Sequence, residues 1–232
     1  MADLTSGQSL KNKFTLSIKQ RILSGELAIG QRLPPEREIA LKAGISRTIV
    51  HTGIADLVAK NVLMVIPRKG TFVNDFRKEA TLELYNAILK YTGRLDENIT
   101  KSLTVYREII ETANAGLAAQ NRSPSDLESL RETLKKERVA SSLDEKVALD
   151  YQFHLQIAQA TGNIVLPMAV RSTEAMYKSL LRLFYEKLQD PGPVFMLQEK
   201  TISAIERRES HEAQAYMKQM LDFGAKVLME QT

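Results

Sequence analysis

Apolar residues in the first third of the chain recur at the spacing of short amphipathic helices. Four of them stand four residues apart: Leu10, Phe14, Ile18 and Ile22. This spacing predicts one helix, which should end near Gly25 because glycine favours the turn that closes a helix. A second helix is predicted to open at Pro35 and Glu36, where proline and an acidic side chain suit a first turn, and to stop at Gly44.

A third helix and a small hairpin follow in the same region. Ser46 is expected to cap this helix, whose apolar side is formed by Val50, Ile54, Leu57 and Val58. Gly53 inside the helix costs about 1 kcal/mol relative to alanine, and it predicts a close crossing with another helix. Two β-type stretches, 62–66 and 71–73, then flank a basic turn. Three helices and a hairpin predict a winged helix-turn-helix domain over residues 8–74.

Glycine and proline become rarer after about residue 79, and the apolar periodicity becomes that of longer helices. Helices are predicted near 80–91, 97–120, 124–140, 144–161, 163–189, 194–208 and 210–230. These seven helices predict an all-α antiparallel bundle over residues 80–230, joined to the first domain by a short linker at 74–79. The expected fold class is therefore mainly α, with one small β-hairpin.

Composition excludes several classes of site. The chain has 232 residues and no cysteine, which excludes disulfides and thiolate metal sites. Its polar first seven residues do not predict a signal peptide, and no apolar run reaches the ~18–20 residues that span a bilayer. We therefore expect a cytoplasmic protein without membrane contact.

Charge is distributed unevenly between the two predicted domains. Residues 1–78 contain 13 basic and 6 acidic side chains, whereas residues 79–232 contain 19 and 22. A basic domain joined to a mildly acidic one is typical of a protein that binds a polyanion such as DNA. Chance clustering gives the same imbalance, so charge alone leaves both interpretations open.

The third helix has the side chains that favour DNA binding. A helix that reads the major groove needs short polar groups and cations near its N-terminus. The candidates are Ser46, Arg47, Thr48 and His51, with Arg37 in the preceding helix and Arg68 and Lys69 at the wing tip. Arg47 can take a guanine or a phosphate, and the wing cations can enter the minor groove. Singly, each residue is better explained as a solvated polar group, but their combination before a basic hairpin favours DNA.

Three motifs in this domain resemble the winged helix of GntR-type transcription regulators. They are LPPERE at 33–38, SRTIV at 46–50 and RKGTFV at 68–73. The resemblance covers about residues 8–74 and implies DNA contacts at Arg37, Arg47, Thr48 and Gly70. His51 stands where that family usually has arginine. One permanent cation is therefore missing, which implies a lower affinity or a different operator.

In the helical domain, Asp150 and His154 are four residues apart and share one helix face. A carboxylate and an imidazole at this spacing can hold a divalent metal, or can simply hydrogen-bond to each other. They can also serve as the acid–base pair of an enzyme. The chain has no nucleophile elbow, no glycine-rich phosphate loop and no metalloprotease motif, which argues against an enzyme.

The helical domain resembles the FCD effector domain of the FadR-type branch of GntR regulators, over about residues 80–228. The resembling segments lie at 106–111, at 150–163 and around Ala204 and Ala213. The resemblance implies a divalent metal held by Asp150, His154 and two later histidines, with an effector carboxylate on the metal and an arginine. Gln198 and Met220 stand at those two later positions, and glutamine and thioether are poor ligands for a hard metal.

Without a metal, Arg107 becomes the expected anchor for an anionic effector. The alternative for Arg107 is a salt bridge to Glu111 on the next turn. The expected effector site therefore comprises Arg107, Asp150, His154, Gln198 and Met220, with a divalent metal left open as a cofactor.

These features together predict a metabolite-responsive repressor. We expect it to bind a palindromic operator in double-stranded DNA as a homodimer, because one small module seldom provides enough affinity and specificity. A small anionic metabolite is expected to change DNA affinity. A DNA binder that responds to no ligand, and an enzyme using Asp150 and His154, remain the alternatives.

Overall fold

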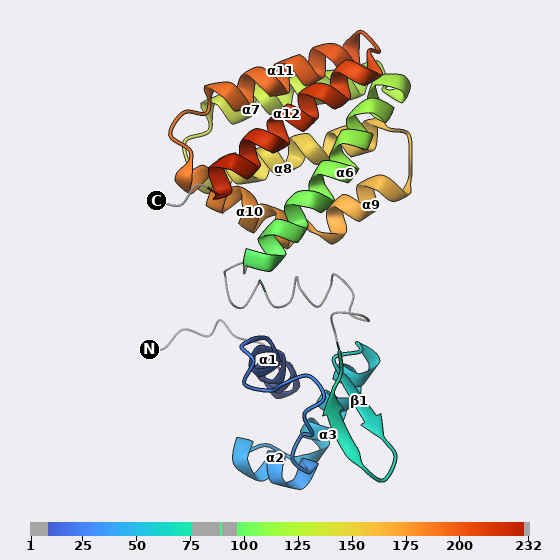
Figure 1. Cartoon of the computed structure of the whole chain (residues 1–232), viewed down its shortest axis with the longest axis vertical. Coiled ribbons are helices and arrows are strands. Elements are labelled where there is room, and N and C mark those ends of the chain that lie inside the picture. Colours follow the sequence, from blue (N-terminus) through green and yellow to red (C-terminus); the bar gives the residue numbers. More distant parts are fainter. Residues whose placement is uncertain (1–8, 76–88, 90–96, 230–232) are drawn as a thin grey trace. The chain divides into compact units, whose positions relative to one another are not determined.

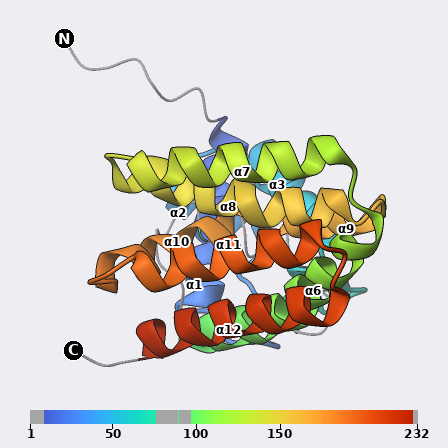
Figure 2. The same cartoon turned by 90° about the horizontal axis from the view of Figure 1, so that it is seen from above.

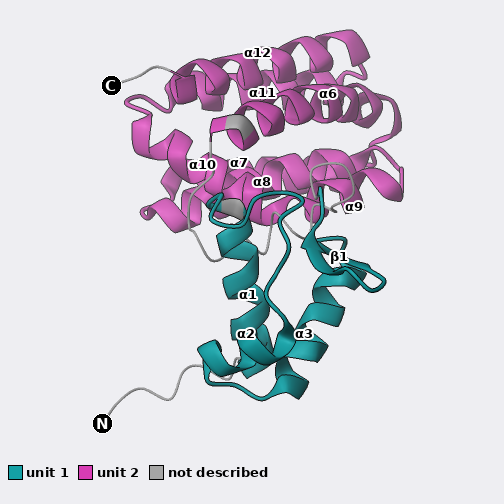
Figure 3. Ribbon diagram, turned by 60° about the horizontal axis from the view of Figure 1, so that its bottom comes forward, with its two compact units in different colours: residues 1–88 teal, residues 89–232 magenta. Residues whose placement is uncertain are grey.

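The computed structural model describes residues 9–75, 89 and 97–229. The chain divides into two compact units, residues 1–88 and 89–232 (Figure 3). Most of the helix predicted at 80–91, and of the linker predicted at 74–79, lies outside the described residues.

The described residues of the first unit form three helices and a two-stranded antiparallel sheet (Figure 1). The elements are α1 (Leu10–Leu23), α2 (Glu36–Ala43), α3 (Arg47–Ala59), β1 (Leu63–Ile66) and β2 (Gly70–Val73). Leu63 pairs with Val73 at one end of the hairpin, and Ile66 pairs with Gly70 at the other. The predicted winged helix-turn-helix is therefore confirmed as the fold of this unit.

Local signals in the sequence account for the ends of these helices. The Ser46 side chain accepts a hydrogen bond from the Ile49 backbone N–H at 3.3 Å, as the prediction of an N-cap required. Gly44 ends α2 with φ 64°, in the left-handed region that glycine tolerates best. The crossing predicted at Gly53 is also present, because a Cβ atom there would stand 2.5 Å from the Phe14 ring. Helices α1 and α3 therefore meet at a glycine.

The second unit is an all-helical bundle. Its described helices are α6 (Glu97–Asn121), α7 (Pro124–Val139), α8 (Leu143–Ala160), α9 (Val165–Ser172), α10 (Glu174–Lys187), α11 (Gly192–Glu206) and α12 (Ser210–Met229). Helix α12 packs along α6 and α11, while α7 and α10 pack against α8. Figure 2 shows α11 beside both α7 and α12. Among the described residues, no helix is both long and apolar enough for a membrane span.

The single helix predicted at 163–189 is wrong, because the chain breaks there into α9 and α10. The break is at Thr173, whose hydroxyl donates to the Val170 carbonyl oxygen at 2.9 Å. The Thr173 carbonyl oxygen then accepts from the Tyr177 N–H at 2.8 Å and starts α10. A threonine that bonds back to the preceding turn competes with the helical ladder, and no glycine or proline marks the position.

Candidate functional site

The N-terminal turns of α3 present a polar surface. Arg47, Thr48 and His51 are exposed there, and Arg37 on α2 is exposed as well. Ser46 is also exposed, although its oxygen is engaged as the helix cap. The His51 Nδ1 atom lies 3.0 Å from Glu36 Oε1. The structure thus brings the predicted α3 side chains together on the outside of the unit.

The hairpin turn holds a second group of cations. Arg68 has φ 63° and Gly70 has φ 119°, and both Arg68 and Lys69 are exposed. A Cβ atom at Gly70 would stand 3.0 Å from the Nε atom of Arg32, which is itself exposed. Sequence reasoning missed Arg32. The available signal was its place directly before the LPPERE motif, and in the structure Arg32 forms an isolated antiparallel bridge with Phe72.

In the bundle, Arg107 is buried with its partners on α6 and α10. Its Nε donates to Glu111 Oε1 at 2.7 Å, and its Nη2 donates to the Tyr177 hydroxyl at 2.7 Å. The guanidinium also stacks 4.0 Å from the centroid of the Tyr177 ring. The salt bridge to Glu111 that the sequence offered as the alternative is therefore present, and it fixes Arg107 inside the bundle.

His154 lies between two carboxylates. Its Nδ1 is 2.5 Å from Glu111 Oε2, and its Nε2 is 3.2 Å from Asp150 Oδ1. Burial alone lowers the pKa of His154, but the two carboxylates outweigh it and raise this pKa to about 9. Burial likewise raises the pKa of Glu111, but Arg107 and His154 outweigh it and hold this pKa at about 2. The predicted Asp150–His154 contact is thus one part of a larger charged cluster.

A third buried acid, Glu137 on α7, joins this cluster through Tyr185 on α10. The Tyr185 oxygen lies 2.7 Å from Glu137 Oε1 and 2.8 Å from Asp150 Oδ2. A phenol has one proton and can donate to one of these carboxyl groups, so the other contact requires a proton on a carboxyl. Burial, followed by repulsion from Asp150, raises the pKa of Glu137 to about 8. Glu137 is therefore the group that keeps its proton at neutral pH.

Gln198 on α11 completes this arrangement. It is fully buried, and its Nε2 donates to Glu137 Oε2 at 3.0 Å. Sequence reasoning included Gln198 but missed Glu137. The signal for Glu137 was its position on the inner face of α7, at helical spacing after Leu127, Leu130 and Leu134, where a charged side chain has no access to solvent.

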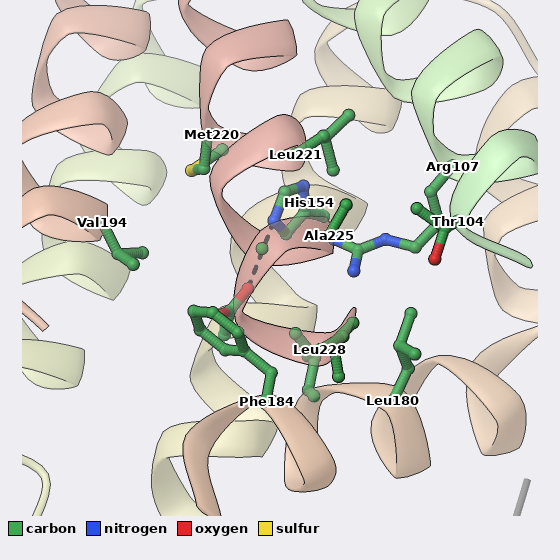
Figure 4. Close-up of a pocket in the computed structure, with 13 residues that line it drawn as sticks. Thr104, Arg107, His154, Leu180, Phe184, Val194, Met220, Leu221, Ala225 and Leu228 are labelled. Carbon is green, nitrogen blue, oxygen red and sulfur yellow. Dashed lines mark ion pairs between the residues drawn. The ribbon is translucent and has the colours of Figure 1, made fainter. Parts of the chain in front are cut away.

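A small cavity adjoins the charged cluster (Figure 4). Its polar end is formed by Thr104, Arg107, Asp150 and His154, and its walls by Leu180, Leu181, Phe184, Val194, Met220, Leu221, Gly224, Ala225 and Leu228. About 30 Å³ is open to the centres of water molecules. Of the five predicted effector residues, four line this cavity, and Gln198 is linked to it through Glu137 and Tyr185.

The residues at this site do not fit a divalent metal. A ligating imidazole needs a free lone pair, but each ring nitrogen of His154 already faces a carboxylate oxygen. The Gln198 amide nitrogen is directed at Glu137, and Met220 offers a thioether. Within the described part of the chain, no group of three or more His, Cys, Asp or Glu side chains is placed to hold a metal ion.

Comparison with curated proteins finds relatives that are named as operon regulators or as a transcriptional activator. The Uxu operon regulator of Haemophilus influenzae is 29% identical over 213 residues, which cover 88% of this chain and 76% of that protein. A putative L-lactate dehydrogenase operon regulatory protein of Escherichia coli is 30% identical over 173 residues, or 73% of this chain and 65% of that protein. The Glc operon transcriptional activator of Escherichia coli is 27% identical over 213 residues, covering 85% and 80%.

Solved structures share the fold. Lar, which controls the expression of the Listeria monocytogenes agr system, superposes with a TM-score of 0.59 at 17% identity, over 97% of this chain and 100% of that one. Escherichia coli McbR/YncC gives a TM-score of 0.51 at 19% identity, over 95% and 97%.

Family models match both units of the chain. Residues 11–73 match the model of bacterial regulatory proteins of the gntR family, and residues 102–223 match the FCD domain. Together, the two matches cover the winged helix and most of the described bundle. The chain therefore belongs to the GntR family of bacterial regulatory proteins, as a DNA-binding transcription regulator with an FCD domain.

Proposed function

We propose that this regulator is a dimeric, metabolite-responsive repressor whose two winged helices bind a palindromic operator. The observation that carries the proposal is the exposed polar face at the start of α3, where Arg47, Thr48 and His51 stand together. An α-helix fits the major groove with its N-terminal residues against the base edges. The enzyme alternative gains no support, because the named relatives are regulators.

Each predicted DNA residue has a role that suits its chemistry. Arg47 reads a guanine or clamps a phosphate, and Thr48 and His51 make short polar contacts beside it. Ser46 caps α3 and places the N-terminal N–H groups of the helix near the phosphates. Arg37 contacts the DNA backbone. Arg68 and Lys69 reach the minor groove from the wing, where Gly70 permits the turn.

The effector is proposed to be a small anionic metabolite that binds in the bundle at Arg107. Its support is a buried guanidinium at the polar end of a cavity whose other walls are apolar. Effector binding would change the spacing of the two winged helices and release the operator. Coupling of this kind is worth ~1–3 kcal/mol in typical regulators.

The variant Arg47→Ala tests the reading helix. Genomic DNA fragments selected by the wild-type protein provide the operator, and fluorescence anisotropy at physiological salt measures affinity. Two arginines per dimer at ~1–3 kcal/mol each predict a loss of roughly 30-fold or more. Sedimentation should show the variant still dimeric.

The matched control is Lys60→Ala, which removes one positive charge at the opposite end of α3. This variant should bind the operator nearly as well as the wild type. Equal affinities for Arg47→Ala and the wild type would show that α3 does not read the DNA. A promoter fused to a reporter gene then gives the sign of regulation, with repression expected.

A further inference from the structure

We propose that the cavity of the bundle is a metal-free site for a small monocarboxylate with an apolar chain, in which the Glu137–Tyr185–Gln198 network occupies the place of a metal. The proposal rests on the proposed effector function and names the chemical class of the effector. Its argument comes from the hydrogen bonds at the polar end and the lining of the walls.

The charged side chains of the polar end contact one another as ion pairs, although Asp150 Oδ1 and His154 Nδ1 make no hydrogen bond within the described residues. Asp150 Oδ1 faces His154 and Asp150 Oδ2 faces Tyr185, so neither carboxylate oxygen is turned toward a cation outside the cluster. The network on the far side of Asp150 consists of side chains from α7, α10 and α11. A ligand that binds by chelating a metal through adjacent hydroxyl and carboxylate groups therefore finds no partner here.

Arg107 retains one donor for a ligand. Its Nε and Nη2 are engaged by Glu111 and Tyr177, while Nη1 makes no hydrogen bond to any residue in the described ranges. The Tyr177 ring, 4.0 Å away, holds the guanidinium plane in position. Figure 4 shows this side chain reaching toward the centre of the cavity. Such a fixed group can donate a hydrogen bond to one carboxylate.

The remaining walls select an apolar chain and reject a second charge. Leu180, Phe184 and Leu221 also line the cavity, and a second carboxylate placed against them would lose its hydration without a hydrogen-bond partner. At Gly224 on α12, an added Cβ atom would stand 4.0 Å from Phe184, so this wall has the least side-chain bulk. A short or branched hydrocarbon chain fits these features best.

The test is calorimetric titration of the full-length, untagged chain after treatment with a chelator. The probes are butyrate and isovalerate, then lactate and glycolate as hydroxy acids, then malonate and succinate as dicarboxylates. We expect the two apolar monocarboxylates to bind at least about tenfold more tightly than the others. Added zinc, nickel or manganese should leave all affinities unchanged, and elemental mass spectrometry should find no stoichiometric metal in the untreated protein.

Two outcomes overturn the proposal, and they differ in whether the proposed effector function fails as well. If hydroxy acids bind best and need an added metal, the metal-free site is wrong but the regulator still has an anionic effector. If no probe binds, with or without metal, and none releases the operator, both the site and the proposed effector function fail.

The variant Arg107→Lys tests the anchoring donor while keeping a cation beside Glu111. It should weaken monocarboxylate binding by roughly tenfold or more, because lysine cannot make the fixed fork of guanidinium donors. The control Arg131→Lys makes the same exchange at an exposed arginine and should bind the monocarboxylates as the wild type does. Unchanged monocarboxylate affinity in Arg107→Lys would overturn the proposal.

Discussion

Glu137 is a single buried side chain whose protonation affects the stability of the protein. Its carboxyl has no access to solvent, and its neighbours are Tyr185 and Gln198 with Asp150 and His154 beyond them. An ionised carboxylate in such a place needs a cation, but the side chains that bond directly to Glu137 are a phenol and an amide. The protein therefore gains stability when Glu137 holds a proton.

This argument predicts how stability depends on pH. The pKa of Glu137 rises from 4.5 to about 8 on folding, so the native state binds more protons than the unfolded state between these values. Stability from this group is therefore complete below pH 4.5 and is lost as the pH rises through 8. The variant Glu137→Gln has no titrating group at this position, so it should lose less stability between pH 6 and 9 than the wild type. The two proteins differ over the roughly two to three pH units in which the wild-type Glu137 loses its proton.

Urea unfolding monitored by tyrosine fluorescence provides the measurement, because the five tyrosines among the described residues all lie in the bundle. His154, with its pKa raised to about 9, adds a loss of stability in the same pH range. That contribution is present in both proteins, so the difference between them isolates Glu137. Parallel stability curves would show that Glu137 is ionised in the native state.

At the scale of elements, the crossing of α1 and α3 depends on Gly53. The variant Gly53→Ala should destabilise the winged helix, because overpacking costs ~1–3 kcal/mol and exceeds the gain of about 1 kcal/mol in helix propensity. Circular dichroism should show an earlier transition that tyrosine fluorescence does not show, since the first unit contributes no described tyrosine. Phe14→Leu in the same background should recover part of the loss.

Gly224→Ala is the control for this substitution. Gly224 also lies inside a helix, but an added Cβ atom there would meet Phe184 at an ordinary 4.0 Å. Its replacement should leave the bundle as stable or stabilise it by up to about 1 kcal/mol. If Gly224→Ala were destabilised and Gly53→Ala were neutral, the close helix crossing at Gly53 would not be what requires glycine there.

The sequence predicted the elements best where residues that cap or terminate a helix are present. Gly44 and Ser46 marked the ends of α2 and α3, because each acts on the backbone within a turn of its own position. The division at Thr173 was missed because its cause is a side-chain hydrogen bond that no glycine or proline announces. The end of a helix can therefore be predicted from the sequence where the residue type itself fixes the backbone conformation.

The polar cluster was only partly predictable. The contact of Asp150 with His154 follows from helical spacing, since both residues are on α8. Tyr185 meets Glu137 across 48 residues of sequence, and Gln198 meets Glu137 across 61. Contacts between different helices depend on how the bundle packs, which periodicity along one helix does not determine.

At the scale of the whole molecule, the two domains differ in net charge, as their different tasks require. The first 78 residues have seven more basic than acidic side chains, whereas the rest has three more acidic than basic. Arg68→Ala removes one wing cation from each chain and two from a dimer. If both contact phosphates, the slope of log affinity against log salt should become shallower by about 1.8.

Anisotropy titrations over a series of salt concentrations measure this slope. Arg131→Ala, which removes an exposed arginine from the bundle, should leave the slope unchanged. The Arg68→Ala loss should be similar on operator and on unrelated DNA, because phosphate contacts do not read sequence. A slope equal to that of the wild type would place the wing away from the DNA backbone.

The small size of the bundle cavity sets the concentration at which such a regulator can respond. At ~10–15 Å³ per water, its 30 Å³ has room for two or three water molecules, which is less than a carboxylate of several carbons needs. A ligand must therefore wait for a rarer, wider conformation. If that conformation is about 1% populated, the apparent dissociation constant is roughly 100-fold higher than that of the wide form. With such a population, the regulator would ignore a metabolite at trace level and would answer when it becomes abundant.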